Sequence, residues 1–472
     1  MKTPDFDQAL NALIEKFNTL RTQRHPATMA DATKDKPTVL IVGAGLAGIT
    51  AANKLAQAGL FVHLIEAKDR VGGRIFTFQA DDEIFIELGA QFLHGIKDNP
   101  LFLAMGKYKV QVQPMSRISC GVFDHNGQEI PYDELVPYIR QYKNDLMSFA
   151  QQRFSDQQDR FQIQQLKEMT KQLEMTGKFE KKYVEDLVKH LSIQEFEQEN
   201  LFSYKLGLQK KESESNFLVT NGFERFIHAM LKEAKDSHHL ELHLNAEVTE
   251  IVHDATECTV TLKNGAQLKG DGIICTVPLG VLQKEKIAFN PALPKSKTTA
   301  IHHLRMASHN KVIMFFKNAF WPNLSHIIVP FDSGNQTWLD IVNLNYFLET
   351  ESPILVVSLH QSPLFHNVAD EKVIKHITEI LQNIFKKSYQ PPKQCWVSRW
   401  DDDPFSFGAY SYHPPGSSLE DNTEIAQPLG RLCFAGEHTD RAPANVQSAY
   451  SSGLESAEQV IMQINDLLNK VG

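Results

Sequence analysis

The chain has 472 residues, of which 42% are hydrophobic, and a formal net charge of −9. One hydrophobic core rarely organises so long a chain, so we expect two closely packed domains. The negative charge argues against binding to nucleic-acid phosphates, and no uninterrupted apolar run is long enough to span a bilayer.

Residues 1–36 precede the first strongly patterned segment. Their apolar side chains recur at helical spacing between Phe6 and Leu20, and the charges among them argue against a secretory signal. We expect an amphipathic helix followed by a polar linker. The alternative is a helix that contacts a membrane or a partner.

The next residues predict a strand, a helix and a second strand. Residues 39–42 form a continuous apolar run typical of a buried parallel strand, and an alanine-rich helix follows to about Ala58. Residues 61–65 predict the second strand, which finishes at Glu66. This is a complete βαβ unit.

Helical and strand patterns alternate along the rest of the chain. Residues 138–200 are rich in Gln, Lys, Glu and Phe and predict two or three helices that project from the core. Short apolar runs predict strands at residues 248–251, 259–262, 272–276, 311–316, 326–330, 338–342, 354–359 and 432–435. Helices are expected at residues 370–386 and 446–468. This order predicts an α/β fold in which a substrate domain is inserted into a split dinucleotide domain.

The division into domains follows the same order. After the N-terminal segment 1–36, we assign residues 37–100, 241–300 and 416–472 to the cofactor domain. Residues 101–240, which include the helical segment, and 301–415 are assigned to the substrate domain.

Cysteine and histidine patterns carry less information. The five cysteines lie far apart and form no CxxC pair, which is typical of free thiols in a reducing compartment. We therefore expect a cytoplasmic protein. The histidines show no HExxH or comparable spacing, so we expect no bound metal.

The strongest local motif is GAGLAG at residues 43–48, which has the form GxGxxG and lies between a predicted strand and a helix. In this form Gly43 permits the tight turn, Gly45 lets a pyrophosphate approach, and Gly48 lets helix and strand pack. The phosphates would lie at the helix N-terminus. Glu66 would accept hydrogen bonds from the adenosine ribose.

Two further segments distinguish FAD from NAD. RVGGR at residues 70–74 provides a second glycine pair, and Arg74 there supplies charge-assisted hydrogen bonds to a pyrophosphate. FAGEHT at residues 434–439 repeats the order of strand, glycine and acid near the other end of the chain. A dinucleotide held by both regions must be long, which favours FAD.

At this point the chain resembles the flavin-containing amine oxidases, and within them the branch of polyamine oxidases and histone-lysine demethylases. The matching segments occur in the family's order and are GAGLAG at 43–48, RVGGR at 70–74, ELGAQFLHG at 87–95, CTVPLGVL at 275–282, NKVIMFF at 310–316, SRWDDDPFSFGAYSY at 398–412 and FAGEHTDRAPANV at 434–446. The resemblance implies a Rossmann-type, glutathione-reductase-like FAD-binding domain that is split across both termini and carries an inserted α+β substrate domain.

The resemblance also implies roles for individual positions. Those that would contact FAD are Gly43, Ala44, Gly45, Gly48, Glu66, Arg74, Gly89, Ala90, Gln91, the backbone of Val248, Glu437 near the ribityl chain, and the N–H of Val446 at the pyrimidine edge. A physical reason supports the last role: the positive end of the final helix would stabilise negative charge on a reduced flavin.

Four residues are candidates for the catalytic site. Lys311 would hydrogen-bond through a water to flavin N5, and a lysine at the start of an apolar strand needs such a partner. The alternative for Lys311 is a strand-end lysine that reaches solvent. Trp400 would pack beside the flavin, and Tyr412 would form one wall of an aromatic cage around the amine. His94 would contact a second amine or a water, or it is structural.

The sequence departs from the family pattern at three places. The second cage wall falls at Asn445 or Ala442, neither of which is aromatic. Gln447-Ser448 replaces a usual histidine-glycine pair, and the segment 138–200 has no counterpart in the family pattern. These departures concern the substrate rather than FAD.

The resemblance implies oxidation of a polyamine-like primary or secondary amine by hydride transfer to flavin N5. Hydrolysis of the imine then gives an aldehyde, and dioxygen gives hydrogen peroxide. One alternative is an L-amino acid oxidase or flavin desaturase with Arg117 or Arg305 as a carboxylate clamp. Another is an FAD-binding interaction module that docks through residues 138–200. The oligomeric state stays open.

Overall fold

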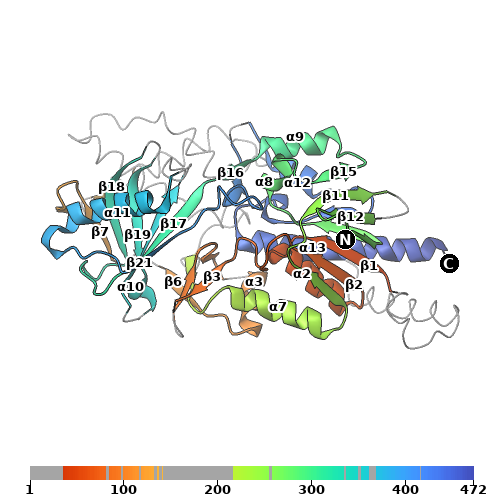
Figure 1. Cartoon of the computed structure of the whole chain (residues 1–472), viewed down its shortest axis with the longest axis horizontal. Helices are drawn as coiled ribbons and strands as arrows, with labels where there is room; N and C mark the ends of the chain where they lie inside the picture. Colours follow the sequence, from red (N-terminus) through yellow and green to blue (C-terminus); the bar gives the residue numbers. More distant parts are fainter. Residues whose placement is uncertain are drawn as a thin grey trace.

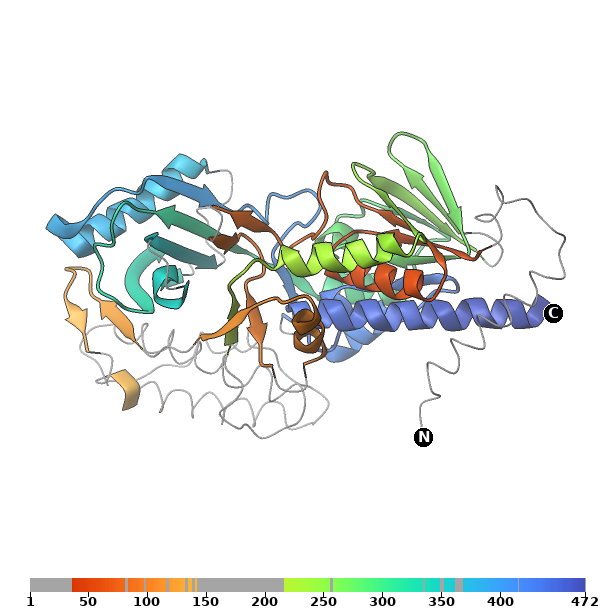
Figure 2. The same ribbon diagram turned by 90° about the horizontal axis from the view of Figure 1, so that it is seen from below.

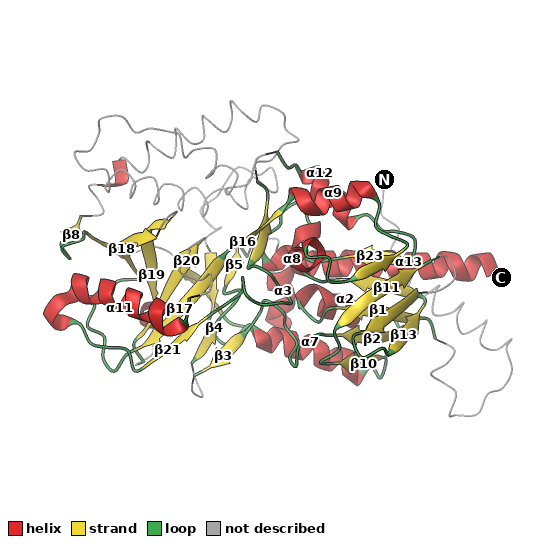
Figure 3. Ribbon diagram, turned by 45° about the horizontal axis from the view of Figure 1, so that its top comes forward, coloured by secondary structure: helices red, strands yellow, loops and turns green. Residues whose placement is uncertain are grey.

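The computed structural model of the protein describes residues 36–80, 84–96, 99–115, 119–131, 135–137, 141, 216–254, 258–333, 336–348, 352–360, 368–414 and 416–471. Two lobes lie side by side along the long axis of the molecule (Figure 1). In Figure 3 the strands fall into two groups, one in each lobe. The α/β architecture expected from the sequence is therefore present.

The first lobe is built on a five-stranded sheet in which every pair of neighbours is parallel. Its order is β10 (Leu240–His243), β2 (Phe61–Ile65), β1 (Thr38–Val42), β14 (Gly272–Cys275) and β23 (Leu432–Phe434). The central strand β1 is apolar throughout because both of its faces are covered. Val39 and Ile41 belong to one core cluster, whereas Leu40 and Val42 belong to another.

Helices cover one face of this sheet, and a second sheet covers the other. The helices on the first face are α2 (Leu46–Gln57), α7 (Glu224–Asp236) and α13 (Val446–Val471), which Figure 2 shows packed side by side. The second sheet has the order β13 (Gln267–Gly270), β12 (Cys258–Leu262), β11 (Val248–His253) and β15 (Ala288–Asn290). Four shorter helices also belong to this lobe: α3 (Pro100–Lys107), α8 (Leu279–Gln283), α9 (Lys295–His303) and α12 (Leu419–Ala426).

The second lobe contains a seven-stranded, mostly antiparallel sheet. Its order is β21 (Gln394–Val397), β17 (His309–Phe315), β20 (Ile354–His360), β19 (Gln336–Asn343), β18 (His326–Ser333), β7 (Cys120–Phe123) and β8 (Glu129–Ile130). Helix α11 (Asp370–Phe385) packs on one face through Val373, Ile377 and Leu381. The short helix α10 (Leu344–Leu348) follows β19. The opposite face of the sheet points away from α11.

Three small sheets and two single turns complete the described fold. The sheets are β3 (Thr77–Gln79) with β4 (Phe85–Glu87), β5 (Phe92–His94) with β9 (Asn216–Val219) and β6 (Val112–Met115), and β16 (Arg305–Ala307) with β22 (Tyr410–Tyr412). The 3-10 turns are η3 (Lys386–Ser388) and η4 (Glu437–Thr439). Strands β3, β6 and β16 lie where the two lobes meet in Figure 1.

The expected strands and the two later helices are confirmed, with ends that differ by up to three residues. The expected N-terminal helix lies outside the described residues, as do the expected helices of 138–200, where Gln141 alone is described. Helix α7, which falls within the segment 101–240, packs against α2 of the first lobe. None of the five cysteines forms a disulfide bond. Within the described part of the chain, no helix combines the length and apolarity needed to cross a membrane.

Candidate active site

A cavity of about 780 Å³ lies where the two lobes meet, lined by residues of both. Its walls include both glycine loops, the end of β2, the N-terminus of α13 and the face of the seven-stranded sheet opposite α11. Ligand pockets in proteins usually measure about 300–1,000 Å³, so the cavity is large enough for a cofactor and a small substrate.

In the glycine loop after β1, neighbouring protein atoms exclude a side chain at two of the three glycines but not at the third. Gly43 has a φ of +104°, and a Cβ there would lie 2.6 Å from Thr276 Oγ1. A Cβ at Gly48 would lie 2.0 Å from the carbonyl oxygen of Gly43. At Gly45, by contrast, the nearest atom to an added Cβ is Gly73 Cα at 4.0 Å. No contact within the described protein therefore requires glycine at position 45, which fits close approach of a ligand.

The N-terminus of α2 is suited to an anion. Gly45 is the N-cap, so no side chain caps the helix, and no acidic residue stands in its first turn. The first N–H groups of a helix have no intrahelical partner, and the helix dipole is positive there. Gly45, Leu46 and Ala47 line the cavity. The residues present therefore fit a phosphate group at this point.

The second glycine pair supports the first loop. Gly72 donates its N–H to the carbonyl of Ala44 at 2.8 Å, and Gly73 packs against Gly45. Arg70 donates to the carbonyls of its own loop, at 2.9 Å to Gly73. Both loops thus form one wall of the cavity.

Glu66 directly follows β2 and lines the cavity. Its two carboxylate oxygens accept hydrogen bonds from the N–H groups of Ala44 at 2.8 Å and Lys68 at 2.9 Å. Burial raises the pKa of Glu66, and these two backbone hydrogen bonds oppose that shift. The side chain is therefore held in one orientation beside the glycine loop.

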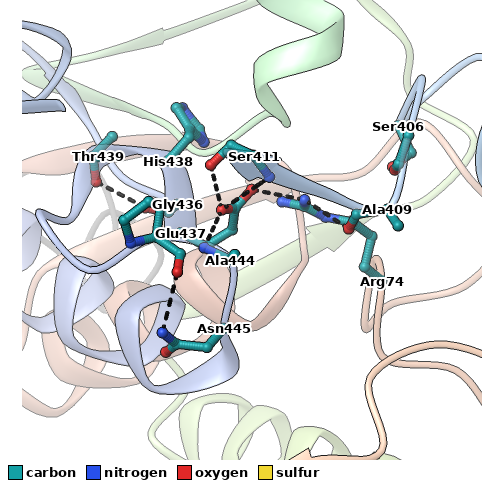
Figure 4. Close-up of polar contacts among 12 residues, drawn as sticks. Arg74, Ser406, Ala409, Ser411, Gly436, Glu437, His438, Thr439, Ala444 and Asn445 are labelled. Atoms are coloured by element: carbon teal, nitrogen blue, oxygen red, sulfur yellow. Dashed lines mark hydrogen bonds and ion pairs between the residues drawn. The ribbon is translucent and has the colours of Figure 1, made fainter. Parts of the chain in front are cut away.

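Arg74 and Glu437 join the beginning and end of the chain. Arg74 Nη1 donates to Glu437 Oε1 at 2.8 Å and to the carbonyl of Ala409 at 3.1 Å. Glu437 also accepts from Ser411 Oγ at 2.6 Å and from the N–H of Ala444 at 2.8 Å, as Figure 4 shows. The carboxylate thus holds three segments of the cavity wall together.

The groups around Glu437 determine its charge and that of His438. Burial alone would raise the pKa of Glu437, but Arg74, His438 and the hydrogen bonds outweigh burial, so the pKa is lowered. Burial lowers the pKa of His438 to about 4, with Glu437 opposing this shift. At neutral pH His438 is therefore uncharged, and Arg74 supplies the positive charge that keeps Glu437 ionised.

Lys311 extends from β17 into the cavity. Its Nζ donates to the carbonyls of Gly89 at 2.7 Å and Glu87 at 3.0 Å, and to Gln91 Oε1 at 2.8 Å. Burial lowers the pKa of Lys311 to about 7, and the Glu87 carboxylate opposes this shift. Burial likewise raises the pKa of Glu87 to about 7, opposed by hydrogen bonds from Phe223 and Thr77. Lys311 does not reach solvent as a strand-end lysine would, since it is 4% exposed.

Trp400 lies beside the same wall. It is buried and donates its indole N–H to the carbonyl of Leu88 at 3.1 Å. Its backbone N–H donates to Asn310 Oδ1 at 2.8 Å. A Cβ at Gly89 would lie 3.0 Å from the Trp400 ring and 2.0 Å from the carbonyl of Arg74. A larger residue at position 89 would therefore clash with the Arg74 carbonyl and crowd the ring.

The side chain of Asn445 makes hydrogen bonds at the start of α13. Its Oδ1 accepts the N–H of Ser448 at 2.8 Å, and its Nδ2 donates to the carbonyl of Ala442 at 2.8 Å. These contacts cap the first turn of α13. The absence of an aromatic residue at 445 is thus explained by a cap at the helix whose first residue, Val446, lines the cavity.

A second tyrosine faces the cavity on the same strand as Tyr412. In β22 side chains alternate, so Tyr410 and Tyr412 line the cavity while Ser411 points to Glu437. The sequence interpretation missed Tyr410, although the order Tyr-Ser-Tyr in a strand would have indicated it.

The seven-stranded sheet adds a polar wall that the sequence interpretation also missed. Alternate residues of β17 to β20 face the cavity, and their neighbours face α11. Besides Lys311, the polar side chains of this wall are His309, His326, Asp340, Ser358 and His360. Finding them requires the register between strands, in which Asp340 pairs with Ser358 and His309 with His360.

The structure brings most of the predicted site residues to one cavity. Those that line it are Gly43, Gly45, Glu66, Arg74, Gly89, Ala90, Gln91, His94, Val248, Lys311, Trp400, Tyr412, Glu437 and Val446. Ala44 and Gly48 lie behind the lining, where Ala44 positions Glu66. Arg305 is exposed on β16 away from the lining, and Arg117 lies outside the described residues.

Comparison with known proteins gives a consistent result. The model of the flavin containing amine oxidoreductase family matches residues 46–461. Polyamine oxidase 5 of Oryza sativa subsp. japonica is 28% identical over 456 residues, which cover 89% of this chain and 87% of that protein. Lysine-specific histone demethylase 1 homolog 2 of the same plant is 29% identical over 454 residues, covering 91% of this chain and 58% of that protein. Lysine-specific histone demethylase 2 of Homo sapiens is 25% identical over 452 residues, covering 89% and 53%.

Proposed function

The chain belongs to the flavin containing amine oxidoreductases, and from this premise we propose that it oxidises a polyamine-like primary or secondary amine. FAD is its cofactor. The proposed reaction takes an amine, dioxygen and water to an aldehyde, hydrogen peroxide and either a smaller amine, from a secondary amine, or ammonia, from a primary amine. FAD, when bound, supplies the acceptor for the hydride that leaves the α-carbon of the amine.

The lobe with the parallel sheet is proposed as a glutathione-reductase-like FAD-binding domain. In this arrangement the α2 N-terminus and Arg74 hold the pyrophosphate, Glu66 the ribose and the Val248 backbone the adenine. We keep the proposed division into cofactor and substrate segments but count α7 with the cofactor domain, because it packs on α2.

The observation that carries the proposed substrate is the composition of the wall beyond Lys311. Tyr410 and Tyr412 project from the same side of β22, so the two rings take the place of a cage built across the cavity. Aromatic faces attract a cationic amine and orient its lone pair after deprotonation. Asp340 places a carboxylate in the same cavity for a second, distant ammonium group, which is a property of polyamines.

Other residues of this chain have supporting roles in the proposal. Trp400 and the apolar parts of the wall exclude water from the reacting carbon. The N–H of Val446 and the positive end of α13 stabilise negative charge at the pyrimidine edge of the cofactor. Lys311 places a positive charge where dioxygen is reduced, and His94 contacts the amine or a water.

The alternative of an amino acid oxidase receives no specific support. Among the described residues, the arginines that line the cavity are Arg74 and Arg441. Arg74 pairs with Glu437, and Arg441 pairs with Glu420 at 3.3 Å near solvent. Arg441 is therefore held near solvent, and Arg74 is the residue proposed above for the pyrophosphate, so neither is left to clamp a substrate carboxylate.

Anaerobic reduction of the purified holoenzyme tests the proposal. A monoamine, a diamine, a triamine with secondary nitrogens, an L-amino acid and a methyl-lysine peptide are mixed singly with the protein, and the flavin absorbance band is followed. We expect the triamine or diamine to reduce the flavin fastest. Reduction by the amino acid alone, or by the peptide alone, would assign a different substrate. A flavin that none of these amines reduces would contradict the proposed activity.

A further inference from the structure

Two histidines and one glutamate meet at the edge of the parallel sheet. His63 lies on β2, and Glu241 and His243 lie on β10, the edge strand next to it in Figure 3. The register pairs His63 with Glu241, and alternation along β10 brings His243 to the same face. His63 lies 180 positions from His243, so no local spacing in the sequence brings the three side chains together.

The distances suit a single metal ion. His63 Nδ1 lies 3.0 Å from His243 Nε2 and 3.5 Å from Glu241 Oε2, and His243 Nε2 lies 3.8 Å from Glu241 Oε1. Two ligand atoms bound tetrahedrally to Zn²⁺ at about 2.0–2.1 Å are separated by about 3.3–3.4 Å. Small side-chain movements would bring all three ligand atoms to one ion. Within the described residues this is the one group of three such ligands that lie this close.

We propose that His63, Glu241 and His243 form a binding site for Zn²⁺ or a similar divalent transition metal. Imidazole and carboxylate ligands suit zinc, whereas Mg²⁺ and Ca²⁺ prefer sites made of oxygen atoms. The ion can enter from solvent, because the Glu241 side chain is 55% exposed while the two histidines are 17% and 21% exposed. Three protein ligands leave the fourth position to water.

A hydrogen bond between two neutral imidazoles is the simpler account of the 3.0 Å distance. It leaves the carboxylate, which lies within 4 Å of both rings, to an ion pair that forms only when one ring is protonated. A metal ion accounts for all three side chains, so it is the stronger inference.

The location gives the site a structural role. None of the three residues lines the cavity, so the ion would not take part in the oxidation of an amine. It would instead join β10 to β2, and Glu66 directly follows β2. The N–H of Glu66 donates to the carbonyl of His243 at 2.8 Å, so the two strands already position Glu66 together. Zinc bound here would stabilise this edge of the cofactor domain.

Calorimetric titration of chelator-treated holoenzyme tests the site. We expect Zn²⁺ to bind with a stoichiometry of one at this site, to raise the thermal midpoint, and to leave the flavin spectrum unchanged, whereas Mg²⁺ should not bind. Co²⁺ should bind with the visible absorption of a tetrahedral or five-coordinate ion. His63→Gln and His243→Gln should each weaken Zn²⁺ binding by about tenfold or more.

Two further variants make the test decisive. His228→Gln removes an exposed histidine from α7 of the same lobe and should leave Zn²⁺ binding unchanged. Glu241→Gln changes an exposed side chain, so it should fold even where a histidine variant does not, and it should also weaken binding. Equal zinc affinity in Glu241→Gln, His228→Gln and the parent protein would overturn the proposal. So would an absence of zinc binding to the parent, which leaves only the hydrogen bond between the imidazoles.

Discussion

Arg74 and Glu437, 363 positions apart in the chain, meet in a salt bridge of 2.8 Å at the wall of the cavity. Arg74 follows the second glycine pair, and Glu437 begins η4 after the last strand of the parallel sheet. Because Glu437 also accepts hydrogen bonds from Ser411 and Ala444, this pair fixes the positions of four segments around the cofactor site. The RVGGR motif at residues 70–74 and the FAGEHT motif at residues 434–439 thus depend on each other.

We predict that Glu437→Gln lowers both the FAD content and the stability of the protein. The substitution keeps the shape of the side chain but leaves Arg74 without its counter-charge, and removal of one partner of a buried pair costs about 3 kcal/mol or more. The flavin-to-protein absorbance ratio and the denaturation midpoint measure the two effects. Glu420→Gln, which breaks the exposed pair with Arg441, is the control and should change neither. Equal FAD content in Glu437→Gln and this control would contradict the prediction.

Asp340→Asn should change the substrate preference. If Asp340 faces a distant ammonium, the variant should raise KM for a diamine by about tenfold while KM for a monoamine of similar length changes little, since tenfold corresponds to about 1.4 kcal/mol. Steady-state peroxide production measures both constants. Asp402→Asn removes the same charge from an exposed position outside the cavity lining and serves as the control. An equal change in KM for both amines would mean that Asp340 only shapes the wall.

The stability of the protein should depend on pH through His438. Its pKa in the folded protein, about 4, lies below the ordinary value of 6.5, so the unfolded chain binds the proton more tightly. This contribution to stability is fully present above pH 6.5 and is lost as the pH falls from 6.5 to 4. The loss of stability amounts to about 3 kcal/mol. His438→Gln should therefore lose less stability between pH 7.5 and 4.5 than the parent protein does.

Denaturation midpoints at the two pH values measure this difference. His303→Gln, at a half-exposed position, is the control and should keep the dependence of the parent protein. If His438→Gln and the parent lose equal stability in acid, other buried groups carry the effect.

Much of the fold follows from local patterns in the sequence. The strand at Val39 to Val42 and the glycine loop after it are predictable because apolar runs and glycine turns act over few residues. The expected strand 311–316 is observed as His309–Phe315, since pairing with β20 extends it backwards over polar residues that periodicity does not indicate.

Site residues were predictable only where they belong to a local sequence motif. Glu66 could be found because it follows an apolar strand of the βαβ unit, and Arg74 because it follows a glycine pair, whereas Asp340 reaches the cavity through the register of four strands. The replacement at Asn445 suggested an open cage, but the structure gives the residue a capping role and places Tyr410 beside Tyr412. Such placements depend on tertiary contacts, and a single sequence does not display them.

Two buried lysines allow the role of Lys311 to be tested against a matched control. Lys311 donates to three acceptors in the cavity wall, and Lys297 donates to the carbonyls of Glu424, Ile425 and Gln427 at the end of α12. Burial lowers the pKa of Lys297 to about 8, compared with about 7 for Lys311. Lys297 does not line the cavity. The two side chains therefore share burial and hydrogen bonding but differ in position.

Lys311→Met and Lys297→Met should both destabilise the protein, because each leaves three buried oxygen atoms without a donor, at about 1–3 kcal/mol for each buried group. Lys311→Met alone should slow the reaction of the reduced enzyme with dioxygen, by about tenfold or more. Negative charge develops on dioxygen as it is reduced, and a nearby cation in a low-dielectric cavity stabilises that charge. Stopped-flow measurement of the reductive and oxidative half-reactions separates the two effects. If the oxidative rates of both variants match the parent, Lys311 supports the wall formed by Glu87, Gly89 and Gln91 and does not act on oxygen. If only the reductive rate of Lys311→Met falls, the lysine orients the amine or its water instead.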